Sequence, residues 1–487
     1  MAYLSAFQGL VSAPFYSLTA DSRKVDVGSL FLAYQGEQSD GRDFIAQAIQ
    51  NGAAGVMLDS PKGDENSFVW DSNWHVPRVA VANLRHHAGE VADEFYGHPS
   101  QKLWTVGVTG TNGKTSVSQW IAQAFNVLNR KTAVIGTLGN GFIGSLNPTA
   151  NTTPDAILLH GLLADYLEQE AEVVAMEVSS HGLDQGRVSG VHFDIAVFTN
   201  LSRDHLDYHG DMANYGAAKK KLFACAGLSC AVINIDDDFG RDLAAELSAS
   251  GKNVLTYGIG AGDINAKSLQ LDNSSISMQI TTPQGDANVS AKVIGRFNAY
   301  NVLAVLATLL ASKVSLDDAV KAIDQIHAVP GRMQTLGGGA LPLVVIDYAH
   351  TPDALEKVLL TLKEQAQGKL ICVFGCGGNR DAGKRNVMGK IATTIADAVI
   401  VTSDNPRDEN AEDIINQIVK DIAVHYIIET DRASAIAIGV LSAKAGDVVL
   451  IAGKGHEDYQ EISGVKQHFS DIEQAEMLLK LYEERFL

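Results

Sequence analysis

The segment at residues 107–116, which reads GVTGTNGKTS, restricts the possible folds of this chain more than any other. It follows an apolar run at residues 103–108 and precedes a run of helical character at 117–128. In this order of strand, glycine-rich loop and helix, backbone N–H groups and a lysine hold the phosphates of a nucleotide. The alternative is an ordinary tight turn. The sequence therefore predicts a nucleotide site between a strand and a helix.

The residue types in this loop suit phosphate binding. Gly110 and Gly113 let the backbone approach the phosphates, and Lys114 supplies positive charge. Thr115 supplies a hydroxyl oxygen for Mg²⁺. The generic phosphate loop has a glycine five residues before Gly113, where this chain has Val108, so GTNGKT is a shorter variant. The loop predicts nucleotide binding, but not what the nucleotide is used for.

Length and composition limit the class of protein. A chain of 487 residues exceeds one hydrophobic core and predicts about three domains. A formal charge of −19 argues against a nucleic-acid partner. No run reaches the ~18 apolar residues of a membrane helix, and the N-terminus lacks the regions of an export signal. We therefore expect no membrane span. The four cysteines in this long chain lead us to expect reduced thiols and a cytoplasmic location.

Apolar runs of strand length alternate with amphipathic segments, which predicts mostly parallel sheets covered by helices. The predicted strands include residues 29–34, 53–58, 78–81, 173–178, 195–199, 343–347, 370–374 and 448–452. The predicted helices include residues 83–96, 299–310 and 353–364. We therefore predict an α/β protein of three domains. These are a small N-terminal α/β domain at residues 1–88, a central phosphate-loop domain at 89–328 and a C-terminal Rossmann-like domain at 329–487.

Seven segments rich in Gly, Asp, His, Arg and Asn follow predicted strands. They read GTNGKTS, EVSSHG, TNLSRDHLDYHG, DYAHTPD, FGCGGNRDAGKR, SDNPRDEN and AGKGHED. Ligands of open α/β sheets bind beyond the carboxyl ends of the strands. Because the seven segments lie in both the central and the C-terminal block, we predict one reaction cleft shared by two domains.

Three residues of the central block have two interpretations each. Glu177 ends an apolar strand, where a carboxylate is either a Mg²⁺ ligand or a solvated strand end. His205 is either a structural hydrogen-bonding residue or a ligand. Lys219 lies on a predicted helix, and composition alone favours a solvated basic face.

Cations in the C-terminal block indicate anion binding. Arg380, Lys384 and Arg385 follow two glycines and predict an anion site, with a surface loop as the alternative. Arg407 follows Pro406, which stiffens a turn that presents a guanidinium suited to carboxylate binding.

The ordered motifs resemble those of one family. GTNGKTS, NTTP at residues 151–154, EVSSHG and TNLSRDHLDYHG are similar to segments of the Mur ligases, cytoplasmic enzymes that add amino acids to the UDP-linked peptidoglycan precursor. DYAHTPDALEK, FGCGGNRD, DNPR and AGKGHEDYQ resemble the members that add 2,6-diaminopimelate. The resemblance covers essentially the whole chain.

This resemblance implies a reaction in two steps. The glutamate carboxylate of UDP-N-acetylmuramoyl-L-alanyl-D-glutamate attacks the γ-phosphate of ATP and forms an acyl phosphate. The amine of meso-diaminopimelate then attacks the acyl carbon and expels phosphate. Mg²⁺ and the phosphate-loop cations stabilise the charge on the phosphoryl oxygens. The implied partners are these three small molecules, and we expect a monomer.

The resemblance also implies the residues of the ATP and metal sites. The catalytic residues are Lys114, Lys219, His205 and Glu177. Thr115, Glu177 and His205 surround Mg²⁺ together with Lys219, which CO₂ converts to a carbamate (N6-carboxylysine) and hence to an oxygen ligand. The ATP contacts are Gly110, Thr111, Asn112, Gly113, Lys114, Thr115, Ser116, Asn298, Arg332 and Asp347.

The substrate contacts are implied in the same way. Arg407 and Arg380 bind carboxylate, whereas Glu457 and Asp404 accept from ammonium. Lysine lacks the distal carboxylate and would leave Arg407 unpaired, so we expect the pocket to reject it. The UDP-precursor contacts are Ala20, Ser22, Glu37, Gln38 and Ser39 in the N-terminal domain, with Asn151, Thr152, Thr153, Ser179, Gln185 and Arg187. The diaminopimelate contacts are Arg380, Asp404, Asn405, Pro406, Arg407, Gly453 and Glu457.

Several alternatives stay open at this point. A related ligase would add L-lysine or extend a folate with glutamate, although Arg407 argues against lysine. A phosphate-loop switch or motor would hydrolyse ATP under the control of a protein partner. A pure nucleotide-binding module would leave the cationic pocket unexplained. Finally, Lys220 and Lys221 crowd Lys219 with like charge, which would lower its pKa and favour carbamylation.

Overall fold

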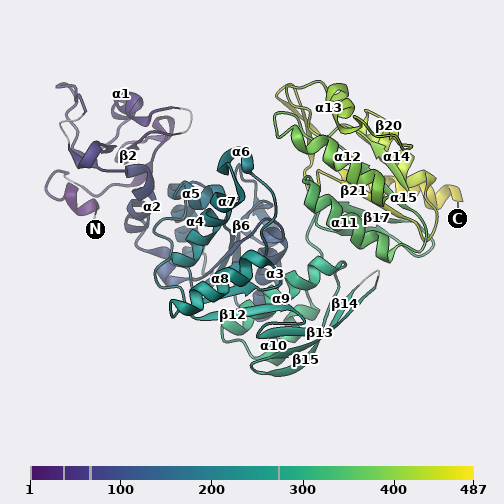
Figure 1. Ribbon diagram of the computed structural model, residues 1–487. Helices are drawn as coiled ribbons and strands as arrows, with labels where there is room; N and C mark the ends of the chain where they lie inside the picture. The colour runs from purple at the N-terminus through teal and green to yellow at the C-terminus, as the bar shows by residue number, and fades with distance from the viewer. Residues whose placement is uncertain (1–2, 12, 37–38, 65–67, 273–274, 487) are drawn as a thin grey trace.

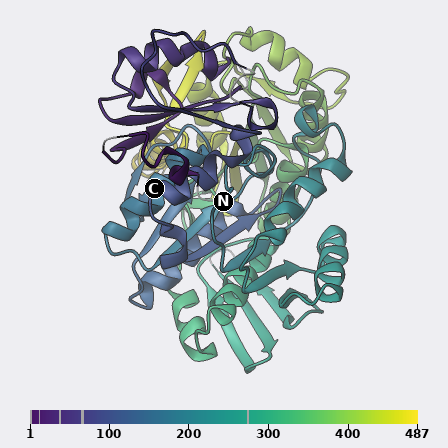
Figure 2. The ribbon, with the colours of Figure 1, turned by 90° about the vertical axis from the view of Figure 1, so that its left-hand side faces the viewer.

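The computed structural model describes residues 3–11, 13–36, 39–64, 68–272 and 275–486. Figure 1 shows an N-terminal body on the left, a central body and a C-terminal body on the right, each built around its own sheet. Seen from the side of the N-terminal body, the small sheet lies in front of the C-terminal body (Figure 2). None of the described helices is long and apolar enough to cross a membrane.

The N-terminal body is a four-stranded parallel sheet with the order β1-β2-β3-β4. Its strands are β1 (Ser17–Thr19), β2 (Ser29–Ala33), β3 (Gly55–Asp59) and β4 (Arg78–Val81), with α1 (Ile45–Gln50) between β2 and β3. Helix α2 (Leu84–Phe95) then packs on both this sheet and α4 (Ala156–Glu168) of the central body. The predicted boundary at residue 88 falls inside α2, so we propose that this helix joins the two bodies.

The central sheet has eleven strands in the order β15-β14-β13-β12-β11-β10-β5-β9-β6-β7-β8. At its centre, β5 (Trp104–Thr109) lies parallel to both β9 (Val173–Glu177) and β10 (Ile195–Phe198). Their carboxyl ends therefore meet, which places the phosphate loop beside Glu177 and Thr199. The other strands are β6 (Thr132–Gly136), β7 (Gly139–Phe142), β8 (Ser145–Asn147), β11 (Cys230–Asn234), β12 (Val254–Ile259), β13 (Ile264–Leu271), β14 (Ile276–Thr282) and β15 (Gly285–Ala291).

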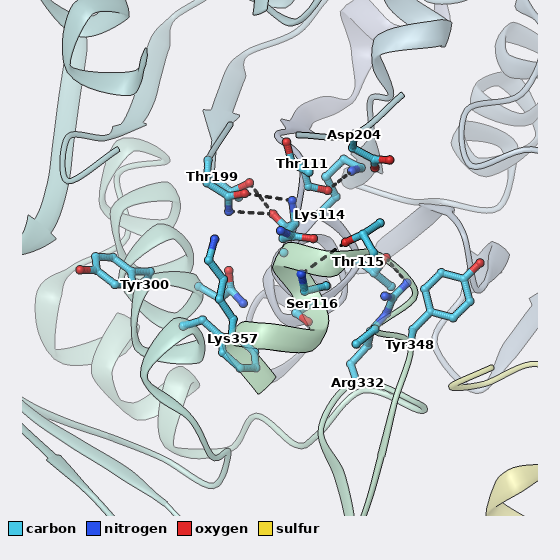
Figure 3. Close-up of a pocket in the computed structure, with 18 of the residues that line it drawn as sticks. Thr111, Lys114, Thr115, Ser116, Thr199, Asp204, Tyr300, Arg332, Tyr348 and Lys357 are labelled. Atoms are coloured by element: carbon cyan, nitrogen blue, oxygen red, sulfur yellow. Dashed lines mark hydrogen bonds between the residues drawn. The ribbon is translucent and has the colours of Figure 1, made fainter. Parts of the chain in front are cut away.

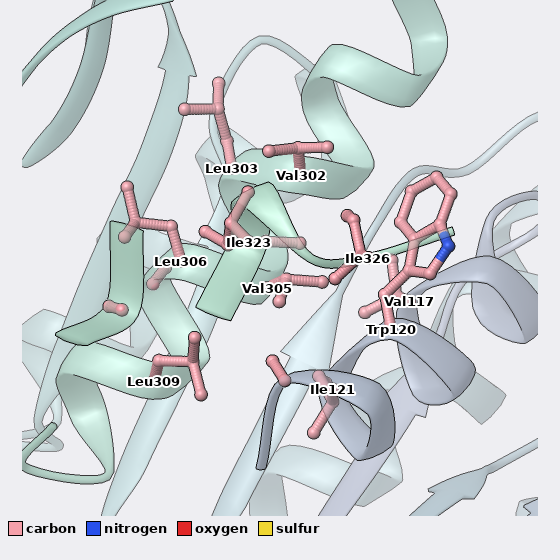
Figure 4. Packing of buried hydrophobic residues seen from close by; sticks show 14 of the residues in the cluster. Val117, Trp120, Ile121, Val302, Leu303, Val305, Leu306, Leu309, Ile323 and Ile326 are labelled. Carbon is pink, nitrogen blue, oxygen red and sulfur yellow. The ribbon is translucent and has the colours of Figure 1, made fainter. Parts of the chain in front are cut away.

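An apolar core anchors the helix that follows the phosphate loop. Helix α3 (Lys114–Val127) packs on α9 (Arg296–Ala311) and α10 (Leu316–Asp324). In Figure 4, Val117 and Trp120 of α3 lie near Val305 of α9 and Ile326, and all four side chains are buried. Burial of each such side chain contributes about 1.5–3 kcal/mol. The remaining helices here are α5 (Ser180–Asp184), α6 (Leu206–His209), α7 (Met212–Lys220) and α8 (Asp238–Ala249).

The C-terminal sheet has the order β16-β17-β21-β18-β19-β20, and all its pairs except β16–β17 are parallel. Separate cores on its two faces lie under α11, α12 and α13 and under α14 and α15. Its strands are β16 (Gln334–Gly337), β17 (Leu343–Asp347), β18 (Leu370–Phe374), β19 (Ala398–Val401), β20 (Ile427–Ile428) and β21 (Val448–Ala452). Its helices are α11 (Pro352–Gln365), α12 (Gly383–Ile395), α13 (Ala411–Ile418), α14 (Arg432–Ser442) and α15 (Asp471–Phe486), and a hairpin, β22 (Tyr459–Ile462) and β23 (Val465–His468), precedes α15.

The structure confirms the α/β class with mostly parallel sheets. The antiparallel strands β7–β8 and β13–β15 and the β22–β23 hairpin were not predicted. The predicted boundary at residue 328 falls between α10 and β16, and we keep it as a proposal.

A buried ion pair ties the C-terminal body together and gives a stability prediction. Arg432 donates to both carboxylate oxygens of Asp471 at 2.7 Å, and both side chains are fully buried. Asp471→Asn should lower the unfolding free energy of this body by about 3–5 kcal/mol, because it leaves the buried guanidinium with only the more distant Asp404 carboxylate, at 4.0 Å, as a counterion. Scanning calorimetry measures the change. Asp238→Asn, which breaks the exposed Arg241–Asp238 pair, is the control and should leave the transition in place. Equal effects would contradict the prediction.

Candidate active site

The phosphate loop has the backbone that its glycines allow. Gly110 has φ 148° and Gly113 has φ 86° at the start of α3, conformations that favour glycine. A Cβ at Gly110 would also collide with the Thr199 hydroxyl. The Lys114 ammonium donates to the carbonyls of Gly110 at 2.9 Å and Thr111 at 2.8 Å. Burial lowers the pKa of Lys114. The loop is thus folded around its own lysine.

Glu177 lies beside this loop rather than in solvent. Its carboxylate accepts from the Thr115 hydroxyl at 2.9 Å and from the backbone and hydroxyl of Thr137 at 2.8 and 3.1 Å. Arg332, from the segment before β16, donates to the Thr115 hydroxyl at 3.1 Å and stacks on the Tyr348 ring (Figure 3). The solvated strand end is therefore the wrong alternative for Glu177.

Lys219 is almost fully buried, which overturns the interpretation from composition alone. Its ammonium donates to the Gly110 carbonyl at 2.7 Å and lies 4.3 Å from the centre of the Tyr215 ring. Burial, and then the charge of Lys114, lower the pKa of Lys219 well below its usual value. Lys220 and Lys221 point elsewhere and pair with Glu246 and Asp184. The like charge that acts on Lys219 is thus that of Lys114, not those of its chain neighbours.

His205 immediately precedes α6 and has φ 54°, and its Nε2 lies 3.3 Å from Asp204. Burial lowers the pKa of His205, which favours the neutral imidazole. Its ring lies 4.8 Å from that of His181. Among the described residues, no three His, Cys, Asp or Glu side chains form a cluster that could hold a metal ion.

Two adjoining cavities open between the central and C-terminal bodies. The first, of about 650 Å³, is lined by residues 111–116, Glu177, His205 and Lys219, and by Asn298, Arg332 and Asp347. Burial raises the pKa of Asp347 to about 6. Tyr300 of α9 and Lys357 of α11, labelled in Figure 3, also line this cavity. Tyr300 lies outside the sequence motifs, and Lys357 ends the DYAHTPDALEK motif without having been assigned a role. The structure thus brings the predicted ATP contacts together, with Gly110 just behind the lining.

The second cavity, of about 1330 Å³, lies between residues predicted to bind the UDP-linked precursor and residues predicted to bind diaminopimelate. Asn151 and Thr152 line it from the central body, and Arg380, Asp404, Asn405, Arg407, Gly453 and Glu457 line it from the C-terminal body. Thr137, Thr152, Asp204, His205, Tyr348, His350 and Thr351 line both cavities. Asp353 also accepts from Asn112 and Ser202 at 2.8 Å, so the two bodies touch beside the phosphate loop.

Other predicted substrate contacts lie outside the second cavity. Ser179 lines the first cavity, and Thr153 lies behind Glu177, where its hydroxyl donates to the Glu177 carbonyl at 2.9 Å. Arg187 donates to the Thr153 carbonyl at 2.9 Å and to Gln185 at 2.8 Å. Pro406 lies in the turn between Asn405 and Arg407. Ala20, Ser22 and Ser39 belong to the N-terminal body, and Glu37 and Gln38 fall outside the described residues.

Buried cations balance the carboxylates of the second cavity. Burial opposes ionisation of Asp404, but Arg432 and Lys454 outweigh it and lower its pKa. Burial raises the pKa of Glu457, which accepts from Asn405 at 2.8 Å and from Lys454 at 3.2 Å. Gly453 has φ 118°, and a Cβ there would lie 2.5 Å from the Asp404 carboxylate. Lys454 is fully buried, and the sequence interpretation had missed it.

The cations expected to form an anion site have separate roles. Arg385 is buried and binds both carboxylate oxygens of Glu409, so it stabilises the loop instead of facing a ligand. Lys384 donates to the His350 carbonyl at 2.8 Å. Arg380 is exposed toward the second cavity. Arg407 lies 3.4 Å from Glu461, so the expectation that it has no counterion when lysine binds is wrong.

A phosphate loop that faces the strand-end loops of a second α/β domain defines a class of nucleotide-binding enzyme with its site between domains. Profiles of known families identify it further. The Mur ligase family catalytic domain matches residues 14–96, the Mur ligase middle domain matches 108–309, and the Mur ligase glutamate ligase domain matches 331–455. The chain belongs to the Mur ligase family.

Relatives extend over nearly the whole chain. A UDP-N-acetylmuramoyl-L-alanyl-D-glutamate–2,6-diaminopimelate ligase of Chromobacterium violaceum is 53% identical over 475 residues, 97% of this chain and 96% of that protein. The protein of this description from Pseudomonas aeruginosa is 50% identical over 470 residues, 96% of this chain and 95% of its own. A solved structure with the same description is 36% identical, has a TM-score of 0.71 and covers 98% of this chain and 99% of its own. The family predicted from the motifs is confirmed.

Proposed function

We propose that this protein is an ATP-dependent ligase that adds meso-2,6-diaminopimelate to UDP-N-acetylmuramoyl-L-alanyl-D-glutamate during cytoplasmic peptidoglycan precursor synthesis. The observation that carries the proposal is 53% identity over 97% of the chain to a relative of that description. The two adjoining cavities support it, because the reaction needs ATP, an acceptor carboxylate and an amine to meet.

The first step forms an acyl phosphate on the acceptor. The glutamate carboxylate attacks the γ-phosphorus of ATP, and the bond to the β,γ-bridging oxygen breaks to release ADP. Phosphate-loop N–H groups and Lys114 would stabilise the charge on the phosphoryl oxygens. Arg332, which already reaches Thr115, would add a second cation from the C-terminal body. Asn298 and Asp347 would complete the ATP site from the domain junction.

The residues beside the loop suit Mg²⁺. The Thr115 hydroxyl and the Glu177 carboxylate lie 2.9 Å apart, and both are the hard oxygen donors that this ion prefers. His205 lines the same cavity and would support the site. When bound, the ion would neutralise the charge of the phosphates.

Lys219 suits carbamylation by CO₂. A lowered pKa raises the neutral fraction of its amine, which is the form that attacks CO₂ and loses a proton as the carbamate forms. The product is an anionic carbamate beside Lys114, whose positive charge would compensate it. Burial would protect this carbamate from water.

In the second step the amine of diaminopimelate attacks the acyl carbon, forms the amide and expels phosphate. Arg380 and Arg407 would bind carboxylate, and Asp404 and Glu457 would accept from ammonium. Asn405 and Gly453 line the cavity around them, and Pro406 would hold the turn between Asn405 and Arg407. The acceptor would extend from Asn151 and Thr152 along Thr153, Ser179, Gln185 and Arg187 toward Ala20, Ser22 and residues 37–39 of the N-terminal domain. We propose that the protein acts as a monomer.

Phosphate release tests the proposal. With ATP, Mg²⁺ and the UDP-linked dipeptide, we expect release with meso-diaminopimelate, weak release with L-lysine and none without an amino acid. Hydroxylamine should trap the acyl phosphate as a hydroxamate. Equal use of L-lysine would favour the related lysine-adding ligase, and ATP hydrolysis that needs no amino acid would contradict the ligase reaction.

A further inference from the structure

Arg407 has an unusual backbone that the β22–β23 hairpin holds in place. Its φ is 52°, in the left-handed region that non-glycine residues rarely adopt. The Arg407 N–H donates to the Glu461 carbonyl at 3.0 Å, and the Ser463 N–H donates to the Arg407 carbonyl at 2.7 Å. Asn405 adds a third link, since its side-chain oxygen accepts from the Glu461 N–H at 3.0 Å. The hairpin therefore fixes where the Arg407 side chain begins.

The same hairpin also supplies the counterion of Arg407. The Arg407 Nε lies 3.4 Å from a Glu461 carboxylate oxygen, while its Nη1 donates to the Gly378 carbonyl at 2.8 Å. Both side chains are partly exposed, at 20% and 24%. Arg407 lines the second cavity, but Glu461 is not among the described residues that do so. Glu461 thus contacts the cavity wall through the Arg407 guanidinium.

Other charges around Arg407 do not replace this pair. Glu409 binds Arg385, and Asp408 accepts from Asn379 at 2.9 Å. Arg380 flanks the same side of Gly377 as Arg407 and adds positive charge. Lys466 of β23 adds a further cation to the cavity wall. Of the ion pairs found among the described residues, the one that Arg407 makes is with Glu461.

We propose that Glu461 is a positioning residue that sets how strongly Arg407 discriminates between amino acids with and without a distal carboxylate. The proposal rests on the proposed function, in which Arg407 binds that carboxylate. Glu461 keeps Arg407 paired when a ligand lacks this group, so binding of such a ligand does not leave the guanidinium without a counterion. It also competes with an incoming carboxylate for the guanidinium, because both carboxylates pair with Arg407. Glu461 therefore makes the pocket less selective than a lone arginine would be.

The test is Glu461→Gln, which removes the charge and keeps the backbone links. The KM for meso-diaminopimelate should fall and the inhibition constant of L-lysine should rise, so that their ratio changes by about fivefold in favour of diaminopimelate. The KM for ATP should stay unchanged, whereas a general structural defect would alter it as well. Glu461→Asp keeps the charge and should restore the wild-type ratio. Glu473→Gln, which breaks the exposed His468–Glu473 pair after the same hairpin, is the matched control.

A mutant cycle tests whether Glu461 acts through Arg407. In an Arg407→Ala background, Glu461→Gln should leave the ratio unchanged. An unchanged or reduced ratio for Glu461→Gln alone would overturn the inference, provided that the wild-type protein uses diaminopimelate. A wild-type protein that uses neither amino acid would refute the proposed function, and the inference with it.

Discussion

Lys219→Ala should lower kcat by about a hundredfold or more, while the KM for ATP changes little. The side chain is buried against the phosphate loop, with its ammonium 2.7 Å from the Gly110 carbonyl. If it carries a carbamate, alanine removes an anionic oxygen ligand from the site where phosphoryl charge develops, and losses of single electrostatic groups there cost about 10²–10³ in rate. Steady-state phosphate release measures both constants.

The carbamate makes two further results expected. Wild-type activity should fall in CO₂-depleted buffer and recover when bicarbonate is added. The Lys219→Ala variant should ignore bicarbonate but regain part of its activity with formate, whose carboxylate can occupy the vacated space. Lys220→Ala is the matched control, because Lys220 is exposed and pairs with Glu246. It should behave as the wild type does.

Two results would contradict this account. Wild-type activity that is indifferent to CO₂ would mean that Lys219 acts as an amine, with its hydrogen bond to Gly110 as its main contribution. Full activity of Lys219→Ala would remove it from the catalytic residues. Either result would leave the family assignment untouched, because that rests on the whole chain.

The sequence predicted the elements that carry a strong local signal. The apolar strand runs and the glycine loop gave β5, β9, β10 and α3 to within a few residues, because strands buried on both faces are nearly all apolar. The antiparallel β13–β15 extension was missed. Its residues alternate between buried and exposed, and they carry polar side chains typical of a one-sided sheet.

Residues of the candidate site were predictable where the residue type itself indicates the chemistry. They were less predictable where the role depends on whether the side chain is buried. Composition placed Lys219 on a solvated face, because nothing in a Lys-Lys-Lys run shows which member points inward. The sequence does not distinguish the roles of Arg385 and Arg407. In the structure, Arg385 pairs with Glu409, whereas Arg407 lines the second cavity. Glu461 carries no motif at all. Long-range partners of this kind are fixed by tertiary packing, which a local pattern does not contain.

Arg407→Ala should raise the KM for meso-diaminopimelate by about a hundredfold, with little change in the KM for ATP. A charge-assisted hydrogen bond to a carboxylate contributes about 1.5–3 kcal/mol. Its loss weakens binding of an anionic group in the second cavity. The first cavity does not include Arg407 among its lining residues, so ATP binding should be spared.

L-Lysine separates loss of the carboxylate contact from general damage to the pocket. It lacks the distal carboxylate, so Arg407→Ala should weaken lysine far less than diaminopimelate, and the two affinities should converge. Arg241→Ala removes an arginine from an exposed pair on α8 and should change neither constant. Equal losses of affinity for both amino acids would mean that removing the Arg407 side chain has also disrupted the left-handed turn at this position. Equal losses for diaminopimelate and ATP would place the amino-acid pocket elsewhere in the cleft.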